Sequence, residues 1–314
     1  MKIADMHCDT IVEIYNNDFS LAKNKLHIDV EKMKKSDYLL QNMAIFLDCT
    51  REKNPSDLAK KVIERYNSET EKNNVNRVYK YSDIDFDKIN TMLTIEDSTI
   101  VPFNQLEEFY NLGVRMITLV WNYPNEVGYP NLDGYNLNSI DDLYRVDNNN
   151  GLTKHGIEYV KKMEELNIIV DVSHGSNKLV TDLLEICSKP FVASHSNSYA
   201  ISPVGRNLND DLILKLIEKE CVMGMNFCTE FINASAKEST IEDLIKHVDH
   251  ILDLGGENSI GFGSDFDGID SLLEIKDSSN MQSIVKAFEK RYTKDVVKKI
   301  CYENVLALYE KTIL

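Results

Sequence analysis

Eight short apolar segments rich in β-branched residues recur along the 314-residue chain, with longer amphipathic segments of helical spacing between them. Near-continuous apolar strands that alternate with helices are typical of a parallel sheet covered on both faces. Eight such units in a chain somewhat longer than about 250 residues predict an α/β fold, a (β/α)8 TIM-type barrel formed as a single domain over residues 1–314. An open doubly wound sheet is the alternative, although the first strand-to-helix turn lacks the GxGxxG pattern that it favours. The predicted strands are 2–7, 38–49, 91–96, 114–122, 167–174, 190–195, 221–227 and 259–266.

Capping residues mark the ends of several intervening helices. Side chains of Ser and Asn accept hydrogen bonds from the first free N–H groups of a helix, and glycine ends one readily. The predicted starts are Ser176, Asn209 and a capping box of Ser239 with Glu242, the last helix ending at Gly255–Gly256, and two further helices are predicted near 280–291 and 294–310.

Two long connections interrupt the alternation of predicted strands and helices, at residues 10–37 and residues 122–150. The second is rich in turn formers and follows the fourth predicted strand as an insertion. A loop of this length at the C-terminal face of a barrel predicts a lid or substrate wall. A disordered insertion is the alternative, but the segment is more aromatic than disordered chain usually is, with Tyr123, Tyr129, Tyr135 and Tyr144.

Composition restricts the class of partner. Hydrophobic residues make up 43% of the chain and charged residues 27%, as in ordinary soluble domains. The net charge of −16 argues against nucleic acid, which is bound through Lys and Arg. No signal peptide or membrane-length apolar run is visible, so we expect a cytoplasmic protein with no membrane partner. The six scattered cysteines are expected to be free thiols.

Metal-ligand side chains follow the predicted strands at their C-terminal ends. His7 and Asp9 are two residues apart, so they should project from one strand end on the same side, while Cys8 should pack on the other. In a barrel all strand ends of this kind meet at one mouth. Three of the seven histidines end predicted strands. The candidate ligands are His7, Asp9, Glu96, His174, His195 and Asp265.

Other histidines and acidic residues of the chain are not predicted to bind metal. His247 and His250 are predicted to be solvated on a helix face, as is His155 at a helix start. The string GFGSDFDG lacks the acidic spacing and the final Glu of a calcium loop. Asp267 either supports the site or shapes the turn.

Imidazoles combined with carboxylates favour zinc, with Mn, Fe or Co as alternatives. Six ligands exceed the needs of one tetrahedral ion and suit two ions that share a bridging carboxylate. Glu96 is the only Glu among them and is predicted to bridge. One ion would then have His7, Asp9, Glu96 and Asp265, and the other Glu96, His174 and His195. Water between two such ions loses its proton near neutral pH, and Asp265 is predicted to pass that proton to a leaving amine.

The motifs HCDT, TIEDS, DVSH, ASHSNSYAISPVGRN, VMGMNF and GFGSDFDG, in this order, resemble the membrane dipeptidase family, which includes renal dipeptidase, within the amidohydrolase superfamily. The resemblance runs from residue 3 to about residue 270. It implies a binuclear zinc barrel that hydrolyses dipeptides, tolerates a D-residue on the C-terminal side and forms a homodimer. It also implies that Arg206 binds the terminal carboxylate of the substrate, and a guanidinium fork suits that group.

One position departs from the family pattern. Where the renal enzyme has a histidine that stabilises the tetrahedral intermediate, this sequence has Trp121. Loss of one such donor typically costs on the order of 10²-fold in rate. Three explanations stay open: the metals carry the stabilisation, Asn122 or Tyr123 substitutes, or the substrate is not a standard dipeptide.

Three hypotheses therefore follow. The first is a metal-dependent dipeptidase with a small dipeptide-like substrate. The second keeps the barrel and metals but acts on another amide, a lactam or an N-acyl amino acid, as Trp121 and the aromatic segment 122–150 suggest. The third is an inactive binding or scaffold protein that retains no metal.

Overall fold

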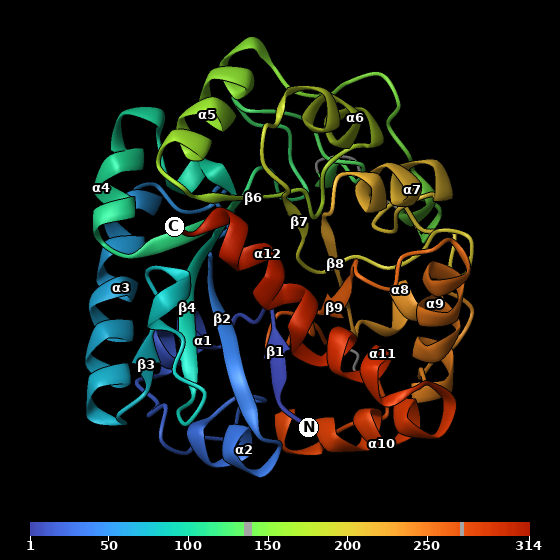
Figure 1. Ribbon diagram of the computed structural model, residues 1–314. Coiled ribbons are helices and arrows are strands. Elements are labelled where there is room, and N and C mark those ends of the chain that lie inside the picture. Colours follow the sequence, from blue (N-terminus) through green and yellow to red (C-terminus); the bar gives the residue numbers. More distant parts are fainter. Residues whose placement is uncertain (135–139, 271–272) are drawn as a thin grey trace.

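The computed structural model describes residues 1–134, 140–270 and 273–314, and its centre is a parallel β-barrel surrounded by helices (Figure 1). All eight predicted strands are present, which confirms the predicted (β/α)8 fold. A ninth, two-residue strand joins the outside of the sheet. The strands are β1 Ile3–Asp5, β2 Tyr38–Phe46, β3 Asn76–Arg77, β4 Asn90–Glu96, β5 Val114–Thr118, β6 Ile169–Asp171, β7 Val192–Ala193, β8 Val222–Met225 and β9 Ile260–Phe262.

The barrel closes because β2 pairs with β4 as well as with β1. The sheet order is β2-β1-β9-β8-β7-β6-β5-β4-β3, and β2 pairs in parallel with β4 from Leu40↔Asn90 to Phe46↔Glu96. β3 adds only two pairs at the start of β4. An open doubly wound sheet is therefore wrong for this chain, because its edge strands would not pair with each other.

Most strands are shorter than the sequence predicts. The apolar run at 167–174 forms strand only over Ile169–Asp171, and His174 at its end has a positive φ of 70°. The chain leaves the extended conformation as soon as the strand reaches the mouth of the barrel. The polar residues predicted at strand ends thus lie at or a few residues beyond them.

Helices cover the outside of the barrel, and those predicted by capping are present. Ser176 and Asn209 accept hydrogen bonds from the first turns of α6 and α7. The capping box of Ser239 with Glu242 is wrong by one residue, since Thr240 and Asp243 form it. The helices are α1 Thr10–Asn17, α2 Val30–Lys35, α3 Pro55–Lys72, α4 Leu106–Asn111, α5 Lys154–Glu165, α6 Asn177–Ile186, α7 Asp210–Glu218, α8 Thr229–Ile232, α9 Ile241–Asp253, α10 Met281–Arg291, α11 Lys294–Lys298 and α12 Asn304–Thr312.

The C-terminal helix α12 closes the end of the barrel opposite the mouth. Its buried residues pack against apolar side chains from near the starts of several strands, such as Leu40, Met92 and Val222. Tyr309 is fully buried there, and its hydroxyl accepts a hydrogen bond from Asn42 Nδ2 at 2.6 Å. The barrel is therefore a packed core rather than a pore, with access from one end.

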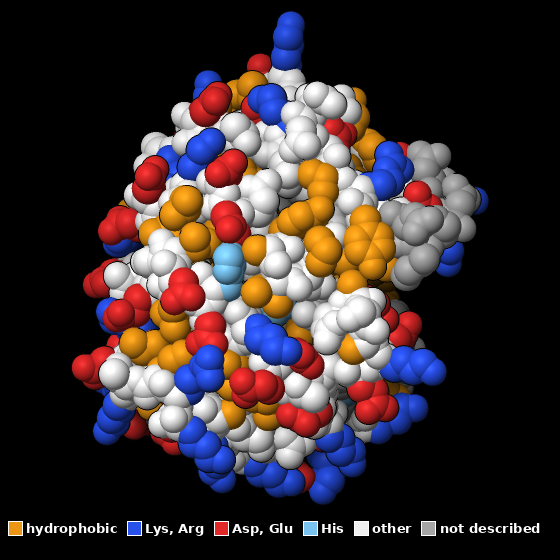
Figure 2. All heavy atoms as spheres, turned by 90° about the vertical axis from the view of Figure 1, so that its right-hand side faces the viewer, with side chains coloured by type: hydrophobic (Ala, Val, Ile, Leu, Met, Phe, Trp, Pro, Cys, Tyr) orange, Lys and Arg blue, Asp and Glu red, His pale blue; other side chains and the backbone are white. Residues whose placement is uncertain are grey.

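Helices form most of the outer surface (Figure 1). On the side of α7 to α10, acidic and basic side chains are interspersed, with hydrophobic groups between them (Figure 2). Within the described ranges, no helix has both the length and the apolar character needed to cross a bilayer. All six cysteines are free thiols, as predicted, and Cys8 is buried with its Sγ 3.3 Å from Asn42 O.

Both long connections contain ordered structure. Residues 10–37 include α1 and α2. In the segment 122–150, Asn131 N donates to His174 O (3.0 Å) and Gly205 N donates to Leu143 O (2.7 Å). The described parts of this segment thus pack against the loops after β6 and β7, as a substrate wall would. Tyr135 lies outside the described residues.

The prediction that His247 is solvated is wrong. Its side chain is fully buried between α9 and the loops after β7 and β8. Ser198 N donates to Nδ1 (3.1 Å), and Nε2 donates to Ile232 O (2.8 Å). His250, one turn later, instead contacts Asp210 at 2.8 Å and is partly exposed. The helical face that includes His247 is covered by loops, which the periodicity of the helix alone does not show.

Because burial lowers the pKa of His247 to about 4, this residue should make stability depend on pH. An unfolded histidine titrates near pH 6.5, so between about pH 6.5 and 4 the unfolded state binds the proton and the folded state does not. Stability should fall by about 3 kcal/mol as the pH falls across this window. We expect His247→Gln to flatten this decline, as measured by urea unfolding at a series of pH values. Parallel pH profiles for the two proteins would contradict the assignment.

Candidate metal and substrate site

All six predicted ligands come together at the C-terminal mouth of the barrel, although they are spread over the sequence from residue 7 to residue 265. Each is at most 8% exposed. Two groups of side chains each place their ligand atoms within 4.8 Å of one another: Glu96, His174 and His195 in one, and His7, Asp9 and Asp265 in the other. These groups match the two predicted ligand sets apart from the shared Glu96.

Glu96, the last residue of β4, lies between the two groups. Its Oε2 is 3.2 Å from His7 Nε2, whereas its Oε1 is 2.9 Å from His174 Nε2 and 3.6 Å from His195 Nε2. His7 Nε2 is also 3.4 Å from Asp9 Oδ2 and 3.8 Å from Asp265 Oδ1. Each carboxylate oxygen of Glu96 thus faces a different group, as a bridging ligand requires.

Hydrogen bonds fix which nitrogen of His174 and of His195 is free. Asn122 Oδ1 accepts from His174 Nδ1 at 2.8 Å. Ser194 Oγ donates to Asp171 Oδ2 at 2.5 Å, so it accepts from His195 Nδ1 at 2.8 Å. Both imidazoles therefore present an Nε2 lone pair to the mouth, as metal-ligating histidines do when a partner holds the other ring nitrogen.

Asp171 lies close enough to His7 and His195 to form a third group of possible ligands. Its carboxylate is already occupied, however. Oδ2 accepts from Thr118 Oγ1 (2.6 Å) and from Ser194, and Oδ1 accepts from the Ser173 backbone and hydroxyl and from Ser194 N. We therefore assign Asp171 to positioning His195 rather than to binding metal. Asp171 is not among the residues predicted from the sequence, although the motif DVSH contains it.

Asp265 is positioned by its backbone and by a neighbouring amide. Its φ is 63°, a conformation uncommon for a residue with a side chain, and Asn226 Nδ2 donates to Oδ2 at 2.9 Å. Gly268 leaves room for it, since a Cβ there would lie 2.5 Å from Asp265 Oδ1 and 2.1 Å from Asp9 Oδ2. The last glycine of GFGSDFDG thus allows the backbone to approach the carboxylates closely.

Asp267, two residues later, shapes the turn. Its side chain accepts from Thr10 Oγ1 at 2.5 Å and from His27 N at 2.8 Å.

Burial and mutual contact shift the pKa values of the cluster strongly. Burial raises the pKa of Asp9 to about 7 and also raises that of Asp265. Burial likewise raises the pKa of Glu96, but His7 and the other two histidines outweigh it and hold that pKa well below the usual range. Burial and the nearby Arg206 lower the pKa of His174 to about 4, so this imidazole is neutral at neutral pH. At His7, burial lowers the pKa, but the carboxylates of Glu96 and Asp9 outweigh it and hold that pKa well above its usual value.

Arg206 lies at the same mouth, in the loop after β7. It is only 3% exposed, and its Nη2 donates to His195 O at 3.3 Å. Nε and Nη1 are buried without a hydrogen-bond partner among the described residues. Buried donors are nearly always paired, so two free donors on one guanidinium indicate a place for an anionic ligand.

Trp121, Asn122 and Tyr123, the candidate substrate contacts after β5, have different neighbours. Trp121 lies between Phe46 and Tyr123, with ring centroids 4.7 and 5.4 Å away, and 6.1 Å from His174. Asn122 contacts His174 Nδ1 through its Oδ1, and its predicted contact with the substrate stays a prediction. Tyr123 faces a neighbouring cavity together with Trp121.

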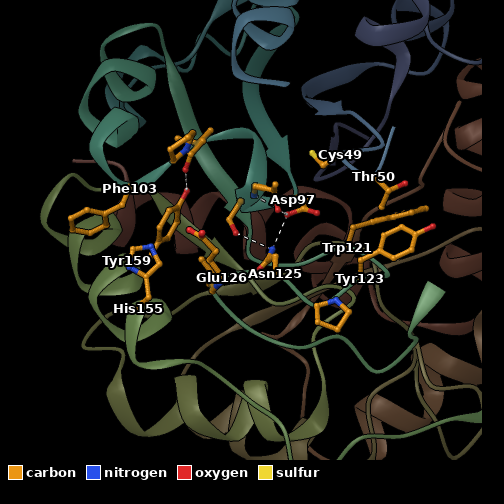
Figure 3. Close-up of a pocket in the computed structure, with 16 residues that line it drawn as sticks. Cys49, Thr50, Asp97, Phe103, Trp121, Tyr123, Asn125, Glu126, His155 and Tyr159 are labelled. Atoms are coloured by element: carbon orange, nitrogen blue, oxygen red, sulfur yellow. Dashed lines mark hydrogen bonds between the residues drawn. The ribbon is translucent and has the colours of Figure 1, made fainter. Parts of the chain in front are cut away.

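This cavity, of about 490 Å³, lies beside the ligand cluster rather than on it. None of the six ligands lines it, but Trp121 borders both, because its ring is 6.1 Å from that of His174 and also forms part of the cavity wall. The cavity continues from Trp121 and Tyr123 past Asp97 to Phe103, His155 and Tyr159 (Figure 3). It is large enough for a substrate side chain.

Solved structures share this fold. A crystal structure of a dipeptidase of metallopeptidase family M19 superposes with a TM-score of 0.86 at 24% identity, over 99% of this chain and 98% of that one. A metallopeptidase from Rhodobacter sphaeroides, solved with a phosphinate mimic of the dipeptide L-Ala-D-Ala, superposes with a TM-score of 0.84 at 23% identity, over 99% of each chain.

Sequence relatives extend the comparison. An uncharacterised Klebsiella pneumoniae protein is 31% identical over 205 residues, which are 64% of this chain and 73% of that protein. An uncharacterised dipeptidase of Schizosaccharomyces pombe is 32% identical over 213 residues, or 67% of this chain but only 49% of the yeast protein. The match thus spans about half of that yeast relative.

The family model of membrane dipeptidases (peptidase family M19) matches residues 1–313, nearly the whole chain. The matched range includes all six clustered side chains and Arg206, and it confirms the family resemblance seen in the motifs. The chain belongs to the membrane dipeptidase family.

Proposed function

We propose that this protein is a metal-dependent dipeptidase that holds two zinc ions at the mouth of its barrel. The observation that carries the proposal is the arrangement around Glu96, whose two carboxylate oxygens face separate groups of buried ligand atoms, with a buried arginine beside them. The solved relative with a phosphinate dipeptide mimic supports a dipeptide substrate.

The unpaired atoms of the cluster fit metal ions. The Nε2 atoms of His174 and His195 are 3.1 Å apart, and the hydrogen bonds of both rings leave both Nε2 atoms as acceptors. Glu96 Oε1 faces the same point, so three acceptors converge where only a cation relieves their repulsion. In the other group, His7 Nε2 and Asp9 Oδ1 are buried without a hydrogen-bond partner among the described residues. Three imidazoles with three carboxylates favour zinc, with manganese or cobalt as alternatives.

Two divalent ions, when bound, supply Lewis-acid polarisation of the scissile carbonyl and a water of lowered pKa. The residues of the chain bind the substrate and transfer the proton. The two free donors of Arg206 bind the C-terminal carboxylate and fix the register of the substrate. Asp265, held by Asn226, accepts the proton of the attacking water and gives it to the leaving amine. The described wall of residues 122–134 limits access of bulk water.

A second candidate keeps the site and changes the substrate to another small amide, a lactam or an N-acyl amino acid. The observation that favours it is Trp121, an indole beside His174 where the resemblance implies a histidine donor. An N-acyl amino acid would still offer a carboxylate to Arg206.

The test is metal analysis followed by a substrate panel. We expect two ions per chain after loading with zinc, and turnover of L,L- or L,D-dipeptides by the loaded protein. Turnover of N-acyl amino acids alone would favour the second candidate. A protein that retains no metal when zinc is supplied would contradict both.

Replacement of Arg206 by methionine, which keeps much of the length without the charge, should weaken substrate binding. We expect kcat/KM for dipeptides to fall by about 10²-fold or more, mainly through KM, because a buried charged hydrogen bond is lost. Steady-state kinetics check this, with dipeptide amides as the control. Amides lack the terminal carboxylate, so the variant and the original protein should differ much less on them. An equal loss on both substrates would contradict the assignment.

For the location and the oligomeric state, we propose that the protein is a cytoplasmic homodimer with no nucleic-acid or membrane partner. The net charge of −16 and the free cysteines support the location, and the resemblance to the membrane dipeptidase family implies the dimer. Light scattering of the purified protein tests the oligomeric state, and cell fractionation tests the location.

A further inference from the structure

We propose that the cavity beside Trp121 receives the side chain of the N-terminal residue of the substrate and selects a long cationic one, lysine or arginine. This inference rests on the proposed dipeptidase activity. It concerns residues outside the metal cluster, chiefly Asp97, which follows Glu96 directly and points into the cavity (Figure 3).

The order of the strands gives the direction of the substrate. Around the barrel, β6 lies between β7 and β5, and β4 follows β5. Arg206 is in the loop after β7, His174 follows β6, and Trp121 and Asp97 follow β5 and β4. A dipeptide with its carboxylate on Arg206 and its peptide bond at the metal cluster therefore extends its N-terminal residue toward Trp121 and the cavity behind it.

Asp97 is a carboxylate with one oxygen left for a ligand. It is 5% exposed, and Thr99 N, Thr99 Oγ1 and Asn125 Nδ2 all donate to its Oδ1 at 2.7–2.8 Å. Over the described ranges, no hydrogen bond or ion pair reaches Oδ2. The residue also has a φ of 83°, where a side chain is rare, so its backbone is kept in an unfavourable conformation.

The walls of the cavity favour a positive charge. Aromatic rings lie on both sides of Asp97, with Trp121 and Tyr123 on one side and Phe103 and Tyr159 on the other (Figure 3). A second carboxylate, that of Glu126, is at the exposed rim. No lysine or arginine is found among the described lining residues. A half-free carboxylate between aromatic faces is a suitable receptor for an ammonium or guanidinium group.

The experiment compares dipeptides that differ only in the N-terminal side chain, with zinc-loaded protein. Norleucine-alanine matches lysine-alanine closely in length and shares its α-ammonium group, but it lacks the side-chain charge. We expect kcat/KM for lysine-alanine to exceed that for norleucine-alanine by on the order of tenfold or more, as one charged hydrogen bond provides. Phenylalanine-alanine tests the aromatic walls alone and should also fall below lysine-alanine.

The variant Asp97→Asn isolates the charge. Asparagine keeps the Oδ1 acceptor for Thr99 and Asn125 and tolerates a positive φ, so only the Oδ2 position changes. We expect the ratio of lysine-alanine to norleucine-alanine to fall to about one. Glu107→Gln, on the exposed face of α4, removes the same charge outside the cavity and should keep the original ratio. Metal content and circular dichroism verify that both variants are intact.

Three outcomes would overturn the inference. One is no preference for lysine-alanine, or a preference for phenylalanine-alanine, in the original protein. Another is an equal loss on lysine-alanine and norleucine-alanine in Asp97→Asn, which would mean that Asp97 binds the α-ammonium group common to both. Failure to hydrolyse any dipeptide would overturn the proposed function and this inference with it, whereas hydrolysis without the lysine preference overturns only the inference.

Discussion

Glu96→Ala is expected to lose both metal ions and nearly all activity. Within the part of the chain that the structure describes, the carboxylate of Glu96 alone has one oxygen toward each ligand group, so its removal takes a ligand from each proposed ion at once. Loss of Lewis-acid stabilisation worth several kcal/mol should lower kcat/KM by about 10³-fold or more. Elemental analysis of the dialysed variant and its kinetics measure the two effects.

The matched control for this prediction is Glu107→Ala, which removes the same side chain from an exposed position on α4. It should keep two ions per chain and its activity. A Glu96→Ala protein that is folded by circular dichroism and retains two ions would show that Glu96 does not bridge, and the proposed metal centre would then be wrong.

Tyr309→Ala is expected to lower the free energy of unfolding by about 3–5 kcal/mol, as large-to-small substitutions of buried aromatic residues do. Tyr309 is fully buried in the contact between α12 and the floor of the barrel. The substitution leaves a cavity there and removes the hydroxyl that accepts from Asn42 Nδ2. Urea unfolding followed by circular dichroism measures the change.

Tyr309→Phe separates the two contributions. It keeps the ring and loses only the hydroxyl, so we expect a smaller loss of about 1–3 kcal/mol, because the Asn42 amide loses its oxygen acceptor. Because the site is at the other end of the barrel, both variants should keep their metal content while folded. A loss below about 1 kcal/mol for Tyr309→Ala would mean that α12 adds little to the stability of the barrel.

The sequence by itself determined the barrel and the identity of the clustered side chains. The hydrophobic pattern of a strand and the polar residues at its end are local properties of the sequence. In a closed barrel, the C-terminal ends of all eight strands lie at one mouth. His7, Glu96 and His195 could therefore be grouped in advance, although hundreds of residues separate some of the ligands. The family resemblance added Arg206, whose free buried donors the structure then showed.

Other features could not be predicted in this way. The solvated interpretation of His247 was wrong because its cover comes from loops after β7 and β8, which are distant in sequence. The contact of Asn122 with His174 joins residues 52 positions apart in the chain, so the local sequence could not show it. The role of Asp171 could not be predicted, because its hydrogen-bond partners Thr118 and Ser194 lie in and directly after the neighbouring strands β5 and β7. Only the pairing of those strands in the folded barrel brings them to its carboxylate.

The sequence thus determined which chemical groups meet at the mouth, because each strand and its polar end can be recognised from a short segment of the chain. Only the tertiary structure decided how each group is used: which histidine nitrogen is free, which carboxylate is already occupied, and which oxygen of Asp97 remains for a ligand. Hydrogen bonds depend on distances of a few tenths of an ångström between distant segments, and those distances are fixed by packing of the whole barrel.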